Sequence, residues 1–249
     1  MIKVSGVALA GVVGCAASAS DLISNGSFES GPSQGCGWIC VAAGSNELPG
    51  WSVVLNTIDR QYTSPPSCMP ETWVAYDGNH SIDLNGCSVG GAIEQTIALE
   101  AGATYRLSFA LTVNAYGTDE PGTVRRLELS IGQSKFEFGV TPTSDAIQPW
   151  LLHDVPFTAP SRLVTIRFKS LNNEHPNFWN GPVIDAVSLT ETCPADVIEN
   201  GVVDAIDLSA VLSSWGTDGG KYPRADVDAN GAVDAIDLAM VLASWGACP

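Results

Sequence analysis

Hydrophobic and polar residues alternate with a period of two over most of the chain, from residue 21 to about 191. The alternating runs, such as 105–111, 126–131 and 163–168, are short and are separated by glycine, proline, asparagine and aspartate. Alternation favours half-buried β-strands, and many short strands at this turn frequency are typical of an antiparallel β-sandwich. We therefore expect residues 21–191 to form one mainly β domain, of a length that fits a jelly roll.

After a short hinge, apolar residues recur instead at i, i+3, i+4 and i+7, in two series thirty residues apart. This spacing predicts two helices with one apolar stripe each, and two stripes can bury each other. The series are Leu208, Val211, Leu212 and Trp215, and Leu238, Val241, Leu242 and Trp245. A glycine follows each series and ends the helix. Residues 193–249 are therefore predicted to form a small α-helical domain.

A loop rich in oxygen-bearing side chains precedes each predicted helix. The second loop has aspartate or asparagine at positions 1, 3, 5, 9 and 12, glycine at position 6, and a backbone carbonyl at position 7. Calcium takes about six to eight oxygen ligands, and the glycine permits the sharp turn that gathers them. The predicted calcium ligands are Asp226, Asp228, Asn230, the carbonyl of Ala232, Asp234 and Asp237.

The first loop is a poorer match, because Ile198 at its position 3 offers no side-chain oxygen. Its predicted ligands are Asp196, Asn200, the carbonyl of Val202, Asp204 and Asp207. We expect tight calcium binding in the second loop and weaker or water-completed binding in the first. The alternative is a pair of solvated acidic linkers, and the close repetition of glycine, aspartate, leucine and tryptophan argues against it.

Residues 193–249 resemble a type I dockerin, which has two loop–helix repeats with calcium ligands at positions 1, 3, 5, 9 and 12. The resemblance is specific in the second repeat and weaker in the first. It implies docking to a cohesin on a scaffold or cell-surface protein. In that family the residues just before the last ligand help to choose the partner; here they are Ala205, Ile206, Ala235 and Ile236. Their identity in both copies suggests an apolar contact face and docking in either of two orientations.

The predicted sandwich carries an ordered series of short sequence phrases. They are NGSFE at 25–29, PGW at 49–51, DG at 77–78, SIDL at 81–84, GAIEQT at 91–96 and GPVIDAVSL at 181–189. Together they resemble the galactose-binding-like sandwich of the DUF642 and choice-of-anchor C families, over nearly all of 22–190. The resemblance implies an extracellular binding module associated with polysaccharide or cell wall, with no catalytic residues to carry over.

A polysaccharide site in such a sandwich needs exposed aromatic rings for sugar faces, and carboxylates or amides for hydroxyls. Most aromatic residues of a sandwich belong to its core, so aromatic residues in polar loops are the better candidates. The predicted ligand-binding residues are Trp73, Tyr76, Asp77, Asn79 and Trp179.

Glu29 and Asp185 occupy the positions of a possible structural cation site. In related sandwiches an acidic residue after the first strand and an aspartate on the last strand approach each other. Oxygen ligands from both would join the two strands through a cation. The equally weighted alternative is that Glu29 is a surface carboxylate and Asp185 an acceptor of hydrogen bonds at a sheet edge.

The charge balance narrows the range of partners. With 11 basic and 27 acidic residues, the formal net charge is -16, which argues against nucleic acid and anionic membrane surfaces. Beyond the N-terminus, no run approaches the roughly 18 apolar residues of a membrane span. No recognised catalytic motif occurs, and the three histidines are isolated. A polysaccharide-active enzyme and a purely structural surface protein are the alternatives to a binding module.

The N-terminus predicts export from the cytoplasm. Lys3 precedes an apolar run over 4–13, and Ala17-Ser18-Ala19 follows as a cleavage signature, so residues 1–20 are predicted to be a signal peptide. In the alternative, Cys15 ends a permissive lipobox and carries lipid. Both imply a secreted protein, attached to the cell surface in the second case.

The other six cysteines are compatible with three disulfides in an oxidising compartment. Cys193 and Cys248 bracket the repeats and are the best single pairing. The remaining four allow three pairings, of which we favour Cys36 with Cys40 and Cys68 with Cys87. No two-residue cysteine spacing occurs and no histidine lies nearby, which argues against a metal site built from these residues.

Overall fold

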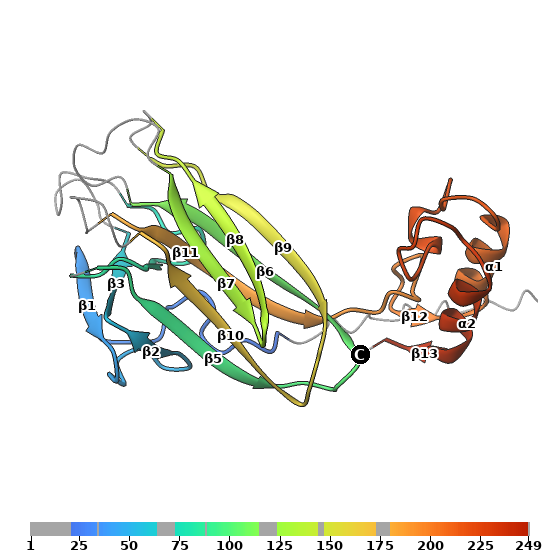
Figure 1. The fold of residues 1–249 in the computed structure, drawn as a ribbon, viewed down its shortest axis with the longest axis horizontal. Coiled ribbons are helices and arrows are strands. Elements are labelled where there is room, and N and C mark those ends of the chain that lie inside the picture. The colour runs from blue at the N-terminus through green and yellow to red at the C-terminus, as the bar shows by residue number, and fades with distance from the viewer. Residues whose placement is uncertain are drawn as a thin grey trace, which may run out of the picture. The chain divides into compact units, whose positions relative to one another are not determined.

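The computed structural model of the 249-residue chain describes residues 21–33, 35–63, 73–87, 89–114, 124–143, 147–172 and 180–248 (Figure 1). The chain divides into two compact units, Ser20–Thr192 and Cys193–Pro249. Several predicted features lie outside the described residues: the signal peptide over 1–20 with Cys15, Cys68, and Trp179. Among the described residues, no helix is long and apolar enough to cross a membrane.

The first unit is a sandwich of two antiparallel sheets (Figure 1). One sheet has the order β1-β3-β4-β11-β6-β9, with β1 (Trp38–Ala42), β3 (Thr57–Tyr62), β4 (His80–Asp83), β11 (Pro182–Glu191), β6 (Thr104–Val113) and β9 (Leu151–Thr158). The other has the order β2-β5-β10-β7-β8, with β2 (Ser52–Leu55), β5 (Ala92–Ala98), β10 (Leu163–Ser170), β7 (Arg125–Ile131) and β8 (Ser134–Val140). The predicted mainly β, antiparallel sandwich is confirmed.

Apolar residues alternate with polar or aromatic ones along β1, β3 and β4, so one face of the six-stranded sheet carries apolar core residues and the other carries polar and aromatic side chains. Val41, Ile58 and Ile82 are fully buried in the hydrophobic core between the sheets. The alternate residues point to the opposite face, and the strand register aligns them in rows. Cys40 lies opposite Asp59, which lies opposite Asp83. Trp38 lies opposite Gln61 in the neighbouring row. Polar and aromatic side chains therefore gather on the outer face of this sheet.

The second unit contains two helices, as predicted, together with a short two-stranded sheet. Its elements are β12 (Val202–Val203), α1 (Ala205–Ser213), the 3-10 helix η1 (Pro223–Ala225), α2 (Ala235–Ala243) and β13 (Gly246–Ala247). Each helix begins with a capping box, in which the N-cap aspartate and the aspartate three residues later bind each other's backbone N–H. Asp204 caps α1 and Asp234 caps α2.

The predicted apolar stripes are wrong in part. Val211 and Val241 are fully buried, but Leu212 and Trp215 are 53% and 47% exposed, and Leu242 and Trp245 are 54% and 51% exposed. The buried stripe of the first repeat is instead Asp207, Ala210, Val211 and Ser214, which has the same spacing shifted by one residue. The shift follows from Asp207, whose carboxylate points inward to bind backbone amides of its own loop.

The cysteines pair differently from the prediction in the first unit. Cys193 and Cys248 form the predicted disulfide. Cys36 is also disulfide-bonded, whereas Cys40 and Cys87 are free thiols, so the pairings Cys36–Cys40 and Cys68–Cys87 are wrong. Between Cys36 and Cys40 the chain enters the extended strand β1, where each residue advances about 3.3 Å. Two cysteines four residues apart in such a segment cannot reach the Cα separation of a disulfide, roughly 4.4–6.8 Å.

Candidate functional site

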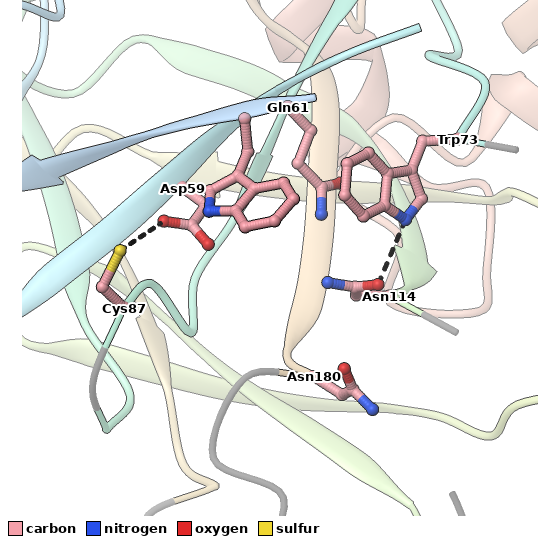
Figure 2. Close-up of a pocket in the computed structure, with 7 residues that line it drawn as sticks. Asp59, Gln61, Trp73, Cys87, Asn114 and Asn180 are labelled. Carbon is pink, nitrogen blue, oxygen red and sulfur yellow. Dashed lines mark hydrogen bonds between the residues drawn. The ribbon is translucent and has the colours of Figure 1, made fainter. Parts of the chain in front are cut away.

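A pocket of about 310 Å³ opens on the outer face of the six-stranded sheet. Its lining consists of Trp38 together with the six residues labelled in Figure 2, which are Asp59, Gln61, Trp73, Cys87, Asn114 and Asn180. The indole rings of Trp38 and Trp73 meet edge to face, with centroids 5.6 Å apart. The pocket therefore combines two aromatic rings with one carboxylate and three amides, a mixture suited to a ligand with apolar faces and many hydroxyl groups.

A chain of hydrogen bonds fixes Trp73. Its indole N–H donates to Asn114 Oδ1 at 3.2 Å, a bond drawn in Figure 2. The amide of Asn114 in turn donates through Nδ2 to Asp83 Oδ2 at 2.7 Å. Asp83 is completely buried and also accepts from the backbone N–H of Asn85 at 2.8 Å. The buried carboxylate thus orients an amide, and the amide orients the aromatic ring that lines the pocket.

Asp59 is the one carboxylate among the described residues that line the pocket. It is 7% exposed. Burial raises its pKa to about 7, and hydrogen bonds from the thiols of Cys87 and Cys40 offset this only in part. Asp83 lies next to it across the strands, and burial together with the charge of Asp59 raises the pKa of Asp83 well above its ordinary value. No lysine or arginine is among the described lining residues, so no positive charge in this part of the pocket favours an anionic ligand.

The second C-terminal loop gathers the oxygen atoms that the sequence predicts. Ligand atoms of Asp226, Asp228 and Asp237 all lie within 4.8 Å of one another. Asp237 is fully buried and accepts backbone N–H groups from Val227 at 2.7 Å and Asp234 at 2.7 Å. A buried carboxylate beside two others is costly unless a cation joins them, so the donor set fits the hard, oxygen-binding ion that the sequence predicts.

The first loop has the same internal connections despite Ile198. Asp207 accepts from the N–H groups of Ile198 at 3.0 Å and Asp204 at 2.9 Å. Asp196 accepts from those of Asn200 at 3.0 Å and Gly201 at 2.7 Å. The fold of the loop therefore survives the isoleucine, and the missing element is one side-chain oxygen.

Two family models match the chain. Residues 21–190 match the family described as "Protein of unknown function (DUF642)", and residues 194–243 match "Dockerin type I domain". The chain belongs to the DUF642 family. A type I dockerin domain follows the DUF642 domain, which confirms the resemblance read from the sequence.

One curated relative is halomucin of Haloquadratum walsbyi, which is 29% identical over 196 residues. The match covers 77% of this chain and 2% of halomucin, so this DUF642 protein spans about a fiftieth of that relative's length.

Among solved structures, TmCBM61 in complex with β-1,4-galactotriose is 18% identical with a TM-score of 0.39, over 70% of this chain and 99% of that one. Arabinose-bound MgGH51 α-L-arabinofuranosidase is 11% identical with a TM-score of 0.43, over 72% of this chain and 27% of that one. Likenesses this distant assign no function to the DUF642 domain.

The DUF642 domain brings only part of the predicted ligand-binding set into the pocket. Trp73 lines it. Tyr76, Asp77 and Asn79 belong instead to the turn before β4. Tyr76 is 47% exposed and packs its ring against Trp150, with centroids 6.1 Å apart. The pocket also contains residues that the sequence pattern does not single out as ligand-binding: Asp59, Gln61, Asn114 and Asn180. The period-two spacing of Trp38 with Cys40 and of Asp59 with Gln61 indicates a shared outer face, and it is the signal that could have found Asp59 and Gln61.

Glu29 and Asp185 bind the two ends of that same turn. Glu29 accepts from the backbone N–H groups of Asn79 and His80, both at 2.7 Å, and Asp185 from those of Tyr76 at 2.8 Å and Asp77 at 3.0 Å. Burial raises the pKa of Asp185 to about 7, and these amides offset part of the rise. The carboxylates therefore connect distant segments through the turn, and a cation shared between them stays a prediction.

Proposed function

We propose that this protein is a secreted, non-catalytic carbohydrate-binding component, held in a larger extracellular assembly by calcium-dependent docking of its dockerin domain to a cohesin. The observation that most directly supports this proposal is the pocket of the DUF642 domain. Its two indole rings offer apolar faces to the C–H groups of a sugar ring, and Asp59, Gln61 and the two asparagines offer partners for hydroxyl groups.

The charge of the pocket favours a neutral glycan. The described lining has no lysine or arginine to pair with a uronate or sulfate group, and the ionised form of Asp59 would repel one. The net charge of -16 opposes a polyanion at longer range as well. The volume lies near the lower end for ligand pockets, roughly 300–1,000 Å³, which suits a chain end or a short segment.

The dockerin part of the proposal rests on the two loops and on the exposed residues before their last ligands. The ligands described above would hold calcium, whose positive charge would join the carboxylates of each loop. Ile206 and Ile236 are 56% and 54% exposed, so both are available to a protein partner. The cohesin partner, the extracellular location and the polysaccharide ligand all belong to this proposal. The Cys193–Cys248 disulfide supports the extracellular location, because disulfides persist in oxidising compartments.

Glycan-array screening followed by calorimetry with the full chain tests the carbohydrate site. We expect a neutral glycan to bind and the Trp38→Ala and Trp73→Ala variants to lose about tenfold or more in affinity, because each removes a ring of the pocket. Tyr76→Ala is the matched control, since this exposed aromatic residue lies outside the pocket. Equal binding by all four proteins, or no binding to any glycan, would overturn the proposal.

The alternative of a polysaccharide-active enzyme needs two carboxylates about 5–10 Å apart at the scissile bond. In the described lining Asp59 is the one carboxylate, and its neighbour Asp83 is completely buried and engaged by backbone and Asn114 amides. Release of reducing sugar from the glycan that binds, abolished by Asp59→Asn, would favour the enzyme. If the unaltered protein binds the glycan but releases no reducing sugar from it, the binding module is supported.

A further inference from the structure

Two cysteine thiols and one carboxylate, those of Cys40, Cys87 and Asp59, lie close together in the DUF642 domain, and two of the three line the pocket. Cys40 on β1 lies directly opposite Asp59 on β3. Cys87, which follows β4, returns to the same place, and its Sγ lies 3.7 Å from Asp59 Oδ1, the contact drawn in Figure 2. Ligand atoms of the three residues all lie within 4.8 Å of one another. Both cysteines are free thiols.

The carboxylate of the cluster, Asp59, is 7% exposed, and among the residues that the structure describes it forms no ion pair with a lysine or arginine. The neighbouring Arg60 points to the other face of the sheet, where it donates to the carbonyl oxygens of Phe28 at 2.9 Å and Glu29 at 3.0 Å. Burial raises the pKa of Asp59 to about 7. Burial, Cys40 and the charge of Asp59 raise the pKa of the Cys87 thiol to about 12. Burial is the largest cause of both shifts.

We propose that Cys40, Asp59 and Cys87 bind a thiophilic divalent metal ion of the zinc class. Two thiolates with one carboxylate are ligands typical of zinc and cobalt, whereas calcium and magnesium take oxygen alone. Bond lengths of about 2.3 Å to sulfur and 2.0–2.2 Å to oxygen, at a tetrahedral angle, give a sulfur–oxygen separation of about 3.6 Å. The observed separation is 3.7 Å.

Metal binding would use all three residues of the cluster. The two thiol protons would leave to solvent, and the ion would neutralise the carboxylate that burial otherwise penalises. Asp59 and Cys87 line the pocket, so water or another oxygen in the pocket would complete four ligands.

A Cys40–Cys87 disulfide is the competing outcome, since two close thiols of an exported chain meet oxidants. Oxidation would join the two sulfur atoms but would leave Asp59 buried without a cation. The carboxylate between the thiols is the feature that favours the metal.

The test uses the full chain, exported to an oxidising compartment and purified without reductant or chelator. Excess calcium first fills the oxygen-lined loops, and cobalt is then added as the spectroscopic probe. We expect one equivalent to bind with thiolate-to-cobalt charge-transfer absorption, and zinc to displace it. Glycan is absent throughout, so the outcome is independent of the carbohydrate proposal.

Variants identify the ligands. Cys40→Ser and Cys87→Ser should abolish the absorption, and Cys87 is exposed, so its replacement leaves the core intact. Asp59→Asn should weaken cobalt binding by at least about tenfold, a loss common even for outer partners of a metal site. Asp77→Asn, a carboxylate of the same domain outside the pocket, is the matched control and should bind normally. No charge-transfer absorption in the unaltered chain, or a Cys40–Cys87 disulfide found by non-reducing peptide mapping, would overturn the proposal.

Discussion

Individual buried polar residues determine the shape of the pocket. Asp83 has no contact with solvent, yet it reaches the pocket through Asn114, which holds the indole of Trp73. A buried hydrogen bond contributes modestly when made and costs more when one partner is removed. The pocket therefore depends on Asp83, a residue that a ligand would not touch.

Replacing Asn114 with alanine tests this dependence. The change leaves the Asp83 carboxylate and the Trp73 N–H without this partner, so we expect a loss of roughly 1–3 kcal/mol in the free energy of unfolding and weaker glycan binding. Urea unfolding and calorimetry measure the two effects. Asn79→Ala is the control, because Asn79 makes its hydrogen bond to Glu29 through the backbone N–H. Unchanged stability and affinity in Asn114→Ala would refute this role.

The burial of His153 leads us to expect that the stability of the DUF642 domain depends on pH. Its ring stacks on Phe109 with centroids 5.2 Å apart and lies 4.7 Å from that of Phe138. Burial lowers its pKa from 6.5, and Asp154 offsets part of this. The unfolded chain therefore takes up the proton more readily, and stability is lost as the pH falls below about 6.5. Thermal unfolding from pH 8 to 5 should show a smaller decline for His153→Phe, which keeps an aromatic ring. An identical decline in both proteins would contradict this assignment.

At the scale of elements, sequence periodicity predicted the strands and both helices but not every buried face. The stripe of α1 was placed one residue off because hydrophobicity alone ranked Leu212 and Trp215 above Asp207. The loop, which needs the Asp207 carboxylate inward, decides the rotation of the helix.

The pocket could not be predicted because its residues come from segments far apart in the sequence. Only strand register brings Cys40 opposite Asp59, and only the return of the chain after β4 adds Cys87. For the same reason, the spacing of the cysteines in the sequence did not predict that Cys40 and Cys87 are free thiols, and the pairings Cys36–Cys40 and Cys68–Cys87 were wrong. Local sequence patterns therefore predict strands and helices, whereas the residues of the pocket come together only through strand register and the path of the loops.

Ile198 is predicted to limit calcium binding by the first loop. Ile198→Asp restores an oxygen ligand at position 3 of a loop that already has its internal hydrogen bonds. Calorimetric calcium titration should show the weaker site tightening by about tenfold or more, since ligand charge sets affinity over several orders of magnitude. Ile198→Ala serves as the control for losing the side chain without gaining an oxygen. If Ile198→Asp matches the unaltered chain, position 3 does not limit the first site.

At the scale of the whole molecule, the chain joins a candidate glycan pocket to a dockerin domain with near two-fold internal repetition. Ile206 and Ile236 occupy equivalent, exposed places in the two repeats. Their equivalence underlies the prediction that a cohesin can dock in either of two orientations.

Substitutions of Ile206 and Ile236, singly and together, distinguish docking of the cohesin in one orientation from docking in two. Ile206→Asp or Ile236→Asp alone should lower cohesin affinity only about twofold, the loss of one of two equal arrangements. The double variant should lose most binding, because a charge would then be buried in both arrangements. Binding calorimetry makes the comparison. Complete loss from one single substitution would show that docking uses one orientation.

The most direct test of the whole account is a bridging experiment. The glycan found on the array is presented as insoluble polysaccharide, and a cohesin selected for dockerin binding is added with the full-length protein. We predict that the cohesin sediments with the polysaccharide only when the protein and calcium are both present. Trp73→Ala should release it by losing the glycan, and Asp237→Ala should weaken the dockerin contact. Cohesin that sediments equally after chelation, or that stays in solution while the protein sediments, would contradict the account.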